Sequence, residues 1–219
     1  MNLSILRTKI LNIVQLKIKL ADVAHDSEHA LRVLRAAERI VHAEDADLEI
    51  VIPAALLHDF VISPKHNPRS RSDSRLSAAF AKKILNSLKG YPPQKIALVY
   101  KAILECSFTK GIKSDFLEGK ILQDADRLDT VGALGIMRAF ATTGQLQVPF
   151  YSLHDPFCQK RKPAPKLYTI DFLYVRSLKV ESSMNTRTGR LLAQERTNYV
   201  KHFLGQLMFE LKQVSRLNK

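Results

Sequence analysis

The sequence predicts an all-α protein. Apolar residues recur at intervals of three and four along nearly the whole chain, which places them on one face of a helix. Runs that alternate apolar and polar residues, which would indicate strands, are almost absent. The 219 residues are 46% hydrophobic, enough to bury one sizeable core. We therefore expect a helical bundle that forms a single domain over residues 1–219.

The first twenty residues are expected to form an amphipathic helix that packs on the core. Basic side chains interrupt this apolar segment at Arg7, Lys9, Lys17 and Lys19. The interruptions exclude the unbroken apolar stretch of a signal peptide or a membrane-spanning helix. The two cysteines, Cys106 and Cys158, provide neither a disulfide framework nor a zinc-type spacing. A reducing, cytoplasmic location is the expectation.

Two further helices are expected between residues 26 and 60. The first is capped by Asp26 or Ser27 and runs to about Val41 with a regular apolar stripe. The second runs from near Asp47 to Phe60. Because it is apolar on all sides before its last residues, it should be a central, buried helix.

Cap and stop signals bound two helices in the middle of the chain. Ser74 is the expected cap of the first, and Gly90 is its C-terminal stop. Pro92 and Pro93 open the second, which should reach Cys106.

A long helix is expected from about Asp115 to Ala141. Asp115, with Glu118 three residues later, resembles a capping box at its start. Residues 142–165 are rich in proline and should form the only long loop.

Two further helices, at about 166–181 and 187–216, complete the expected fold. They would form a C-terminal helical extension, residues 166–219, that packs on a core of about 21–141. No internal repeat or low-complexity tract divides the chain.

The pair His58-Asp59 is the most informative local feature. It ends the apolar run from Ile50 to Leu57, so both side chains emerge from the core. An adjacent imidazole and carboxylate are costly to bury unless a charge pairs with them, and a divalent cation uses both. The alternative is a histidine at the C-terminal cap of the helix, beside a solvated aspartate. This alternative does not explain the preceding apolar run.

A second histidine lies on the preceding helix. His29 shares a face with apolar residues at 33, 37 and 40, so its ring should point into the core. Taken alone, a histidine at this position is more often a hydrogen-bonded core residue than a metal ligand. His25 lies one helical turn earlier, but it ranks below His29 as a ligand because Asp26 explains the local pattern as a cap.

Acidic residues in the long helix supply further candidate ligands. Asp124, Asp126 and Asp129 lie within an apolar pattern, and Arg127 lies among them. Ion-paired surface acids are the alternative explanation. The three helices that carry these histidines and aspartates are expected to surround one metal ion.

Two histidines and two aspartates offer nitrogen and oxygen donors without sulfur. Such a set suits Mn, Fe, Co, Ni, Zn or, less well, Mg. A metal of this kind lowers the pKa of bound water and polarises a phosphoryl oxygen. The formal charge of +13 favours an anionic partner, and a phosphate ester or anhydride fits both properties.

The order His29, His58-Asp59, Asp126 resembles the HD superfamily of metal-dependent phosphohydrolases. The sequence is most similar to the bacterial branch typified by YedJ, over essentially the whole chain. The matching stretches are Ala24-His25-Asp26, His29, Arg32-Val33, Leu57-His58-Asp59, Lys65, Lys120-Ile121-Leu122-Gln123-Asp124-Ala125-Asp126-Arg127-Leu128, Gly132-Ala133-Leu134-Gly135-Ile136, Asp155-Pro156-Phe157, Met184-Asn185-Thr186 and Leu192-Ala193.

This resemblance implies a single HD-type domain with a metal site at its centre. The implied metal ligands are His29, His58, Asp59 and Asp126. Asp124 is the alternative for the fourth place. The resemblance further implies that Asp59 and Lys65 are catalytic and that Lys65 contacts phosphate, with Arg69 as a second substrate contact. A solvated loop lysine explains Lys65 equally well on sequence alone.

The sequence departs from the family pattern at two places. Cys106 and Phe172 stand where the family usually has histidine. Neither position belongs to the four implied ligands, so metal binding should survive. Substrate positioning or proton transfer could be weaker.

The expected function is a metal-dependent phosphohydrolase that acts through metal-activated water on a nucleotide or related phosphate. A nucleoside triphosphate pyrophosphohydrolase is one form of it. The alternatives are a phosphodiesterase for a cyclic or signalling nucleotide, and a non-catalytic HD protein that binds nucleotide or nucleic acid. Nucleic acid is not favoured, because aromatic residues are not interleaved with the basic ones. No membrane partner is expected.

Overall fold

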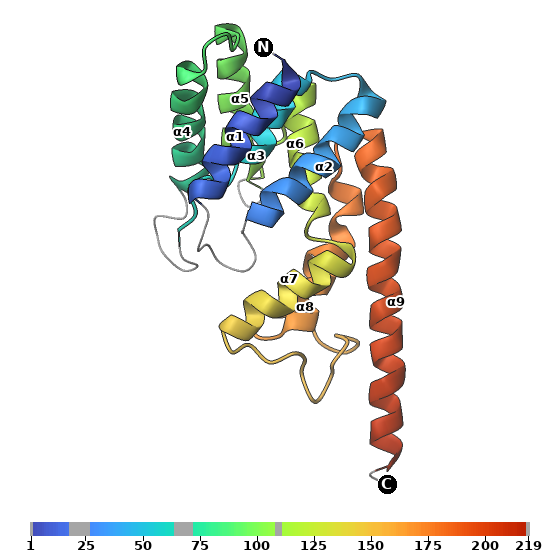
Figure 1. Ribbon diagram of the computed structural model, residues 1–219. Coiled ribbons are helices and arrows are strands. Elements are labelled where there is room, and N and C mark those ends of the chain that lie inside the picture. Colours follow the sequence, from blue (N-terminus) through green and yellow to red (C-terminus); the bar gives the residue numbers. More distant parts are fainter. Residues whose placement is uncertain (1, 18–26, 64–71, 108–110, 218–219) are drawn as a thin grey trace. The chain divides into compact units, whose positions relative to one another are not determined.

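The computed structural model describes residues 2–17, 27–63, 72–107 and 111–217 (Figure 1). Within these ranges every regular element is a helix and none is a strand. The helices are α1 (Leu3–Lys17), α2 (Ser27–Glu44), α3 (Leu48–Leu57), α4 (Asp73–Ser87), α5 (Pro93–Cys106), α6 (Leu117–Leu128), α7 (Gly132–Gln145), α8 (Thr169–Val175) and α9 (Arg187–Leu217), with 3₁₀ turns η3 (Ser177–Lys179) and η4 (Glu181–Ser183). The all-α prediction is confirmed.

The chain divides into two compact units. Unit 1 contains the residues up to Arg127 together with Asn185–Gly189, and unit 2 contains Leu128–Met184 and the residues from Arg190 onward. The chain therefore leaves unit 1 in the last turn of α6, returns to it for five residues, and leaves it again within α9. The predicted single domain, with a core of 21–141 and an extension of 166–219, stays a prediction.

Helix α3 is the centre of unit 1. All residues from Ile50 to Leu57 are buried, as its uninterrupted apolar sequence predicts. Helices α1, α2, α4 and α5 pack against it, and α4 and α5 lie side by side as a hairpin (Figure 1). Because α3 ends at Leu57, three residues earlier than predicted, His58 occupies its C-terminal cap.

The N-terminal segment packs on this core, as predicted. Helix α1 buries Leu6, Ile10 and Val14 and contacts α3. In the described part of the chain, no helix is both long enough and apolar enough to cross a membrane.

The start of α3 is held by a polar cluster. The Asp47 side chain accepts a hydrogen bond from the backbone N–H of Glu49 at 2.8 Å, the usual arrangement of a helix cap. Lys95 on α5 pairs with both acids, at 2.6 Å to Asp47 and 2.5 Å to Glu49. These contacts fix the register of α3 against α5.

Two predicted helix starts need correction. Helix α4 begins at Asp73 after Ser72, so Ser74 lies inside the first turn and is not the cap. The predicted capping box at Asp115 is also wrong. Glu118 accepts from the backbone N–H of Asp47 at 3.1 Å, while Asp115 pairs with Lys101. The start of α5 at Pro93 is confirmed.

The single long helix predicted from Asp115 to Ala141 is wrong, because the chain breaks it into α6 and α7. Gly132 has φ +81°, a backbone conformation that side chains disfavour and that cannot continue a helix. The interruption is stabilised because the freed carbonyl of Leu128 accepts from Arg196 at 2.5 Å, and that of Thr130 from Ser177 at 2.9 Å.

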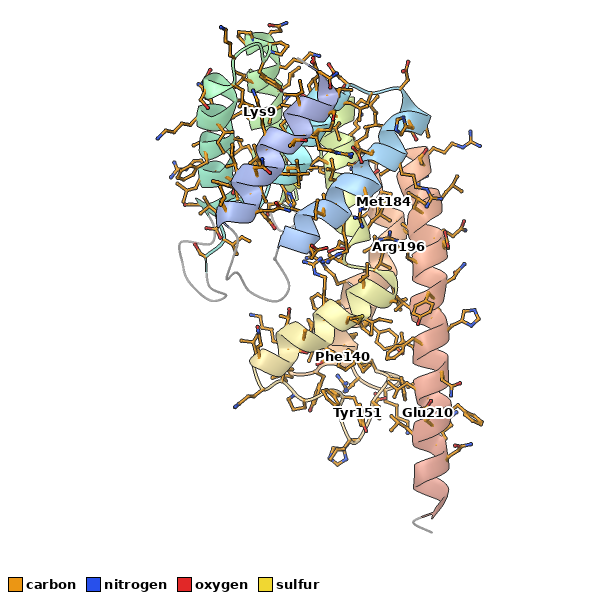
Figure 2. The ribbon with its side chains drawn as sticks, in the orientation of Figure 1. Lys9, Phe140, Tyr151, Met184, Arg196 and Glu210 are labelled. Carbon is orange, nitrogen blue, oxygen red and sulfur yellow. The ribbon has the colours of Figure 1, made fainter. Side chains whose placement is uncertain are left out.

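Unit 2 is built on α7, α8 and the greater part of α9. Phe140, labelled in Figure 2, packs edge-on against Phe150 and Phe203, with ring centroids 5.4 and 6.4 Å away. The predicted helix at 166–181 is shorter, since α8 covers only Thr169–Val175 and the two 3₁₀ turns follow.

Candidate functional site

Three segments of unit 1 bring histidine and aspartate side chains to one place. His29 lies in the first turn of α2, His58 and Asp59 follow α3, and Asp126 lies on α6. Each of His29, His58 and Asp126 presents one ligand atom, and these atoms lie within 4.8 Å of one another. In the described part of the chain, this is the group of histidine, cysteine and acidic side chains that could hold a metal ion.

The distances within the cluster are short and similar. The Nε2 atoms of His29 and His58 are 3.2 Å apart. Asp59 Oδ2 lies 3.6 Å from each of these nitrogens. Asp126 Oδ1 lies 3.6 Å from His29 Nε2 and 3.8 Å from His58 Nε2. All four side chains implied by the sequence therefore meet at the two imidazoles.

Hydrogen bonding fixes the orientation of the His58 ring. Its Nδ1 lies 2.8 Å from the carbonyl oxygen of Ala55, which can only accept, so Nδ1 carries the proton. Nε2 then presents its lone pair to the cluster. Metal-binding histidines commonly have this arrangement, in which the second nitrogen donates to a backbone carbonyl.

The donor set fits a divalent cation. Metal–nitrogen and metal–oxygen bonds of about 2.0–2.2 Å place neighbouring donors about 3.0–3.5 Å apart, close to the separations in this cluster. A divalent cation would also offset the like charges of the two carboxylates that face this partly buried site.

The cluster is buried on one side and open on the other. The side chains of His29 and His58 are 1% and 3% exposed, whereas those of Asp59 and Asp126 are 37% and 24% exposed. Solvent can therefore reach the carboxylate side.

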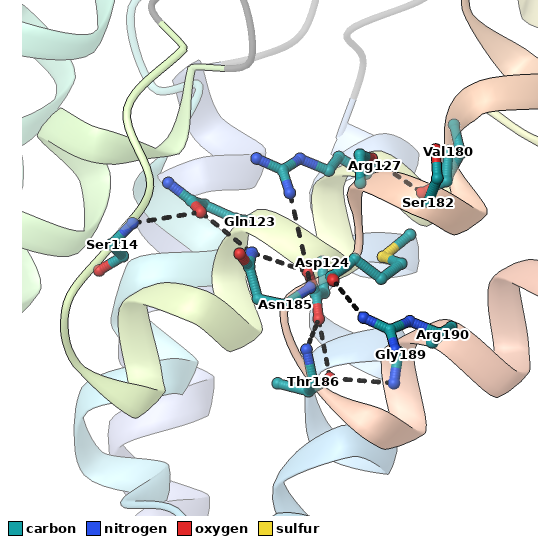
Figure 3. A network of polar contacts seen from close by, with 12 residues as sticks. Ser114, Gln123, Asp124, Arg127, Val180, Ser182, Asn185, Thr186, Gly189 and Arg190 are labelled. Carbon is teal, nitrogen blue, oxygen red and sulfur yellow. Dashed lines mark hydrogen bonds and ion pairs between the residues drawn. The ribbon is translucent and has the colours of Figure 1, made fainter.

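Asp124, the alternative for the fourth ligand, binds other residues. It is fully buried on α6, and its carboxylate accepts hydrogen bonds from Asn185 and Thr186, the first residues of the returning segment (Figure 3). Asp129 lies in unit 2, where it pairs with Arg138 at 2.6 Å. Of the three acids predicted on this helix, Asp126 is the one at the cluster.

The other candidates from the sequence lie outside the described residues. These are His25, the proposed cap Asp26, Lys65 and Arg69. In the sequence, Lys65 and Arg69 follow Asp59 by six and ten residues.

Comparison with known proteins identifies the family. The HD domain family matches residues 26–131, a region that contains all four clustered side chains. YpgQ of Bacillus subtilis is 33% identical over 189 residues, covering 84% of this chain and 82% of YpgQ. The chain belongs to the HD superfamily.

Solved structures agree with this assignment. The crystal structure of B. subtilis YpgQ in complex with ADP has a TM-score of 0.72 and 28% identity, covering 96% of this chain and 97% of YpgQ. An HD-superfamily hydrolase from Bacillus thuringiensis has a TM-score of 0.72 and 25% identity, covering 96% and 99% of the two chains. This HD protein therefore has the fold of HD-superfamily hydrolases.

Cys106 lies beside the HD cluster. The thiol is buried at the end of α5. Its burial raises the pKa of Cys106 well above the ordinary value, and the negative charges of Asp126 and Asp59 raise the pKa further. The thiol is therefore neutral at physiological pH.

Sequence reasoning missed the polar contacts behind α6. In the sequence, Asn185 and Thr186 are notable only because they belong to a stretch that resembles the family. Nothing in their local sequence connects them with Asp124, which lies about 60 residues earlier in the chain.

Proposed function

We propose that this HD protein is a metal-dependent phosphohydrolase in which His29, His58, Asp59 and Asp126 hold one divalent ion. The observation that carries the proposal is that His29 from α2, His58 and Asp59 from the end of α3, and Asp126 from α6 converge. The two imidazole Nε2 atoms lie 3.2 Å apart, and each carboxylate lies 3.6–3.8 Å from them. The candidate ions are Mn, Mg, Co, Ni, Fe and Zn.

The ion and the residues around it have different roles in this proposal. A divalent ion in such a site lowers the pKa of water and polarises a phosphoryl oxygen. His58 is held in the ligand tautomer by Ala55. The exposed side of Asp59 and Asp126 leaves room for a phosphate group to approach. Lys65 and Arg69 would neutralise part of its negative charge.

A nucleotide is the proposed substrate. The related protein YpgQ has been crystallised with ADP, an anionic phosphoanhydride. The formal charge of +13 favours substrates of this kind. Within this class, we propose hydrolysis of a nucleoside triphosphate that releases pyrophosphate or phosphate.

The first prediction concerns Asp59. The Asp59→Ala variant should reduce kcat by at least about 100-fold. It removes one ligand of the ion, and the ion itself contributes several kcal/mol to catalysis. Phosphate and pyrophosphate release should be measured with nucleoside and deoxynucleoside triphosphates in the presence of Mn, Co or Mg. Asp115→Ala is the matched control, because its side chain is 74% exposed and pairs with Lys101 on the surface.

The two possible contradictions differ in meaning. If the wild type binds metal and nucleotide but releases no product above the Asp59→Ala background, the protein is a non-catalytic nucleotide-binding HD protein. If the Asp59→Ala and Asp115→Ala variants lose activity equally, the site is elsewhere.

A further inference from the structure

The carboxylate of Asp124 is surrounded by donors from a segment that is distant in sequence. Oδ1 accepts from the backbone N–H and the side-chain amide of Asn185, at 2.8 and 2.9 Å. Oδ2 accepts from the backbone N–H and the hydroxyl of Thr186, at 2.8 and 2.7 Å (Figure 3). Four hydrogen bonds to one carboxylate with no exposed surface form a rigid connection.

Asn185 also binds the residue that precedes Asp124. Its side-chain amide lies 3.1 Å from Oε1 of Gln123. The amide nitrogen of Gln123 in turn donates to the carbonyls of Glu105 and Ile112, both at 2.8 Å. The segment therefore holds α6 at two consecutive residues, and α6 in turn holds the end of α5.

The geometry of α6 connects this contact with the metal cluster. Asp124 and Asp126 are two residues apart, so their side chains leave the helix about 200° apart. The face that binds Asn185 and Thr186 is thus opposite the face that presents Asp126 to the two histidines. A carboxylate roughly 5 Å from the helix axis moves about 1 Å when the helix rotates by about 10°. Metal ligation tolerates displacements of only about 0.2 Å.

We propose that Asp124 is a positioning residue, which fixes the rotation of α6 through Asn185 and Thr186 and so places Asp126 in the metal site. This inference rests on the proposed metal site and goes beyond it. Asp124 does not touch the metal or the substrate. It acts through Asp126, and the segment 185–189 is as much a part of the site as the HD pair.

Gly189 allows the segment 185–189 to lie close to Asp124. A Cβ at this position would lie 2.5 Å from Asp124 Oδ2 and 2.7 Å from Thr186 Oγ1, closer than real contacts allow. The segment can approach Asp124 only because residue 189 lacks a side chain. The next residue back, Thr188, is anchored independently, since its backbone N–H donates to Glu44 at 2.9 Å.

Two pairs of variants test the inference in the full chain. Thr186→Val removes the hydroxyl donor to Asp124 at nearly constant volume, whereas Thr186→Ser retains it. Gly189→Ala places a methyl group against the Asp124 carboxylate. Gly205→Ala changes a glycine of the same helix, where the added Cβ would have no atom within 4 Å. The dissociation constant for Mn²⁺ should be measured by the spin-resonance signal of the free ion, together with the melting temperature without metal and with kcat and KM.

Thr186→Val and Gly189→Ala should each raise the Mn²⁺ dissociation constant on the order of tenfold, as loss of an indirect metal contact typically does. Their kcat should fall more than their KM rises. Thr186→Ser and Gly205→Ala should stay within about twofold of the wild type. Wild-type Mn²⁺ affinity in both test variants, even with a lowered melting temperature, would show a structural role and overturn the inference. A wild type that binds none of the candidate ions would overturn the proposed function itself, and the inference with it.

Discussion

At the scale of single residues, Asp171 shows how several partners stabilise a buried charge. Asp171 in unit 2 has no exposed side-chain surface. Both amino groups of Arg161 donate to its carboxylate, and the backbone N–H of Ala164 donates at 2.6 Å. Burial acts to raise the pKa of Asp171, but the hydrogen bonds from Arg161 and Ala164 outweigh it and hold the pKa below its ordinary value.

Asp171→Asn should destabilise the protein by about 3 kcal/mol at pH 6, because it leaves Arg161 without its charged partner. A lowered pKa in the folded state means that the charged carboxylate stabilises the fold above the unfolded pKa of about 3.9. This stabilisation is lost as the pH falls through the folded pKa. The difference between variant and wild type should therefore shrink towards pH 2.

Urea unfolding of both proteins at pH 6 and at pH 2–3 measures this difference. The control is Asp115→Asn, which alters a surface pair and should change stability by less than about 1 kcal/mol. A difference for Asp171→Asn that does not depend on pH would contradict the assigned ion pair.

Residues at the site could be predicted from the sequence where the chemistry is local. The HD pair follows an uninterrupted apolar run, and His29 lies on an apolar stripe, so both were expected to face the core. The choice among Asp124, Asp126 and Asp129 could not be made from spacing. It depends on Asn185, Thr186 and Arg138, which engage two of the three acids.

At the scale of elements, the break between α6 and α7 shows where helical periodicity misleads. The apolar pattern continues across the break, so it predicts one helix. Val131 is extended, with φ −136° and ψ 158°, and Gly132 has φ +81°. A continuous helix would also have left the Ser177 hydroxyl and the Arg196 guanidinium without the carbonyls that they bind. Contacts from distant parts of the chain thus outweigh the local preference for a helix.

Gly132→Ala should destabilise the protein by about 1–2 kcal/mol, because a residue with a Cβ is strained in this left-handed conformation. Its Cβ would also lie 3.2 Å from Cβ and Cγ of Arg196. Gly144→Ala, near the end of α7, has open space around it and should stabilise the helix by up to about 1 kcal/mol. Thermal unfolding of the two variants provides the comparison. Equal stability of both would mean that residue 132 adopts a helical backbone in solution.

At the scale of the whole molecule, the proposed ion would join three separate segments of unit 1. The four ligands come from α2, the end of α3 and α6, which span residues 27–128 of the chain. An ion that binds only when these segments are folded together must stabilise the folded state.

Mn²⁺ at about 100 times its dissociation constant should stabilise the folded protein by about 2.7 kcal/mol. For a chain of this length, the Tm of the metal-linked transition should rise by about 5–10 °C. Calorimetry with Mn²⁺ and with excess chelator measures the shift. His29→Ala should abolish the shift, while His42→Ala, an exposed position on the same helix, should retain it. An unchanged wild-type Tm would argue against the four-ligand site.

The sequence by itself determined the helical class, most helices of unit 1, and the placement of His29 and the His58-Asp59 pair towards the core, whereas Asp126 was implied only by the resemblance to the HD superfamily. These follow from apolar periodicity, from glycine and proline signals, and from charged residues that interrupt apolar runs, all of which act over a few residues. Only the tertiary structure decided that α6 ends before Gly132, that Glu118 binds Asp47, and that Asp124 accepts hydrogen bonds from Asn185 and Thr186. Hydrogen bonds between groups that lie far apart in the sequence depend on where the folded chain places them, and no local pattern encodes that placement.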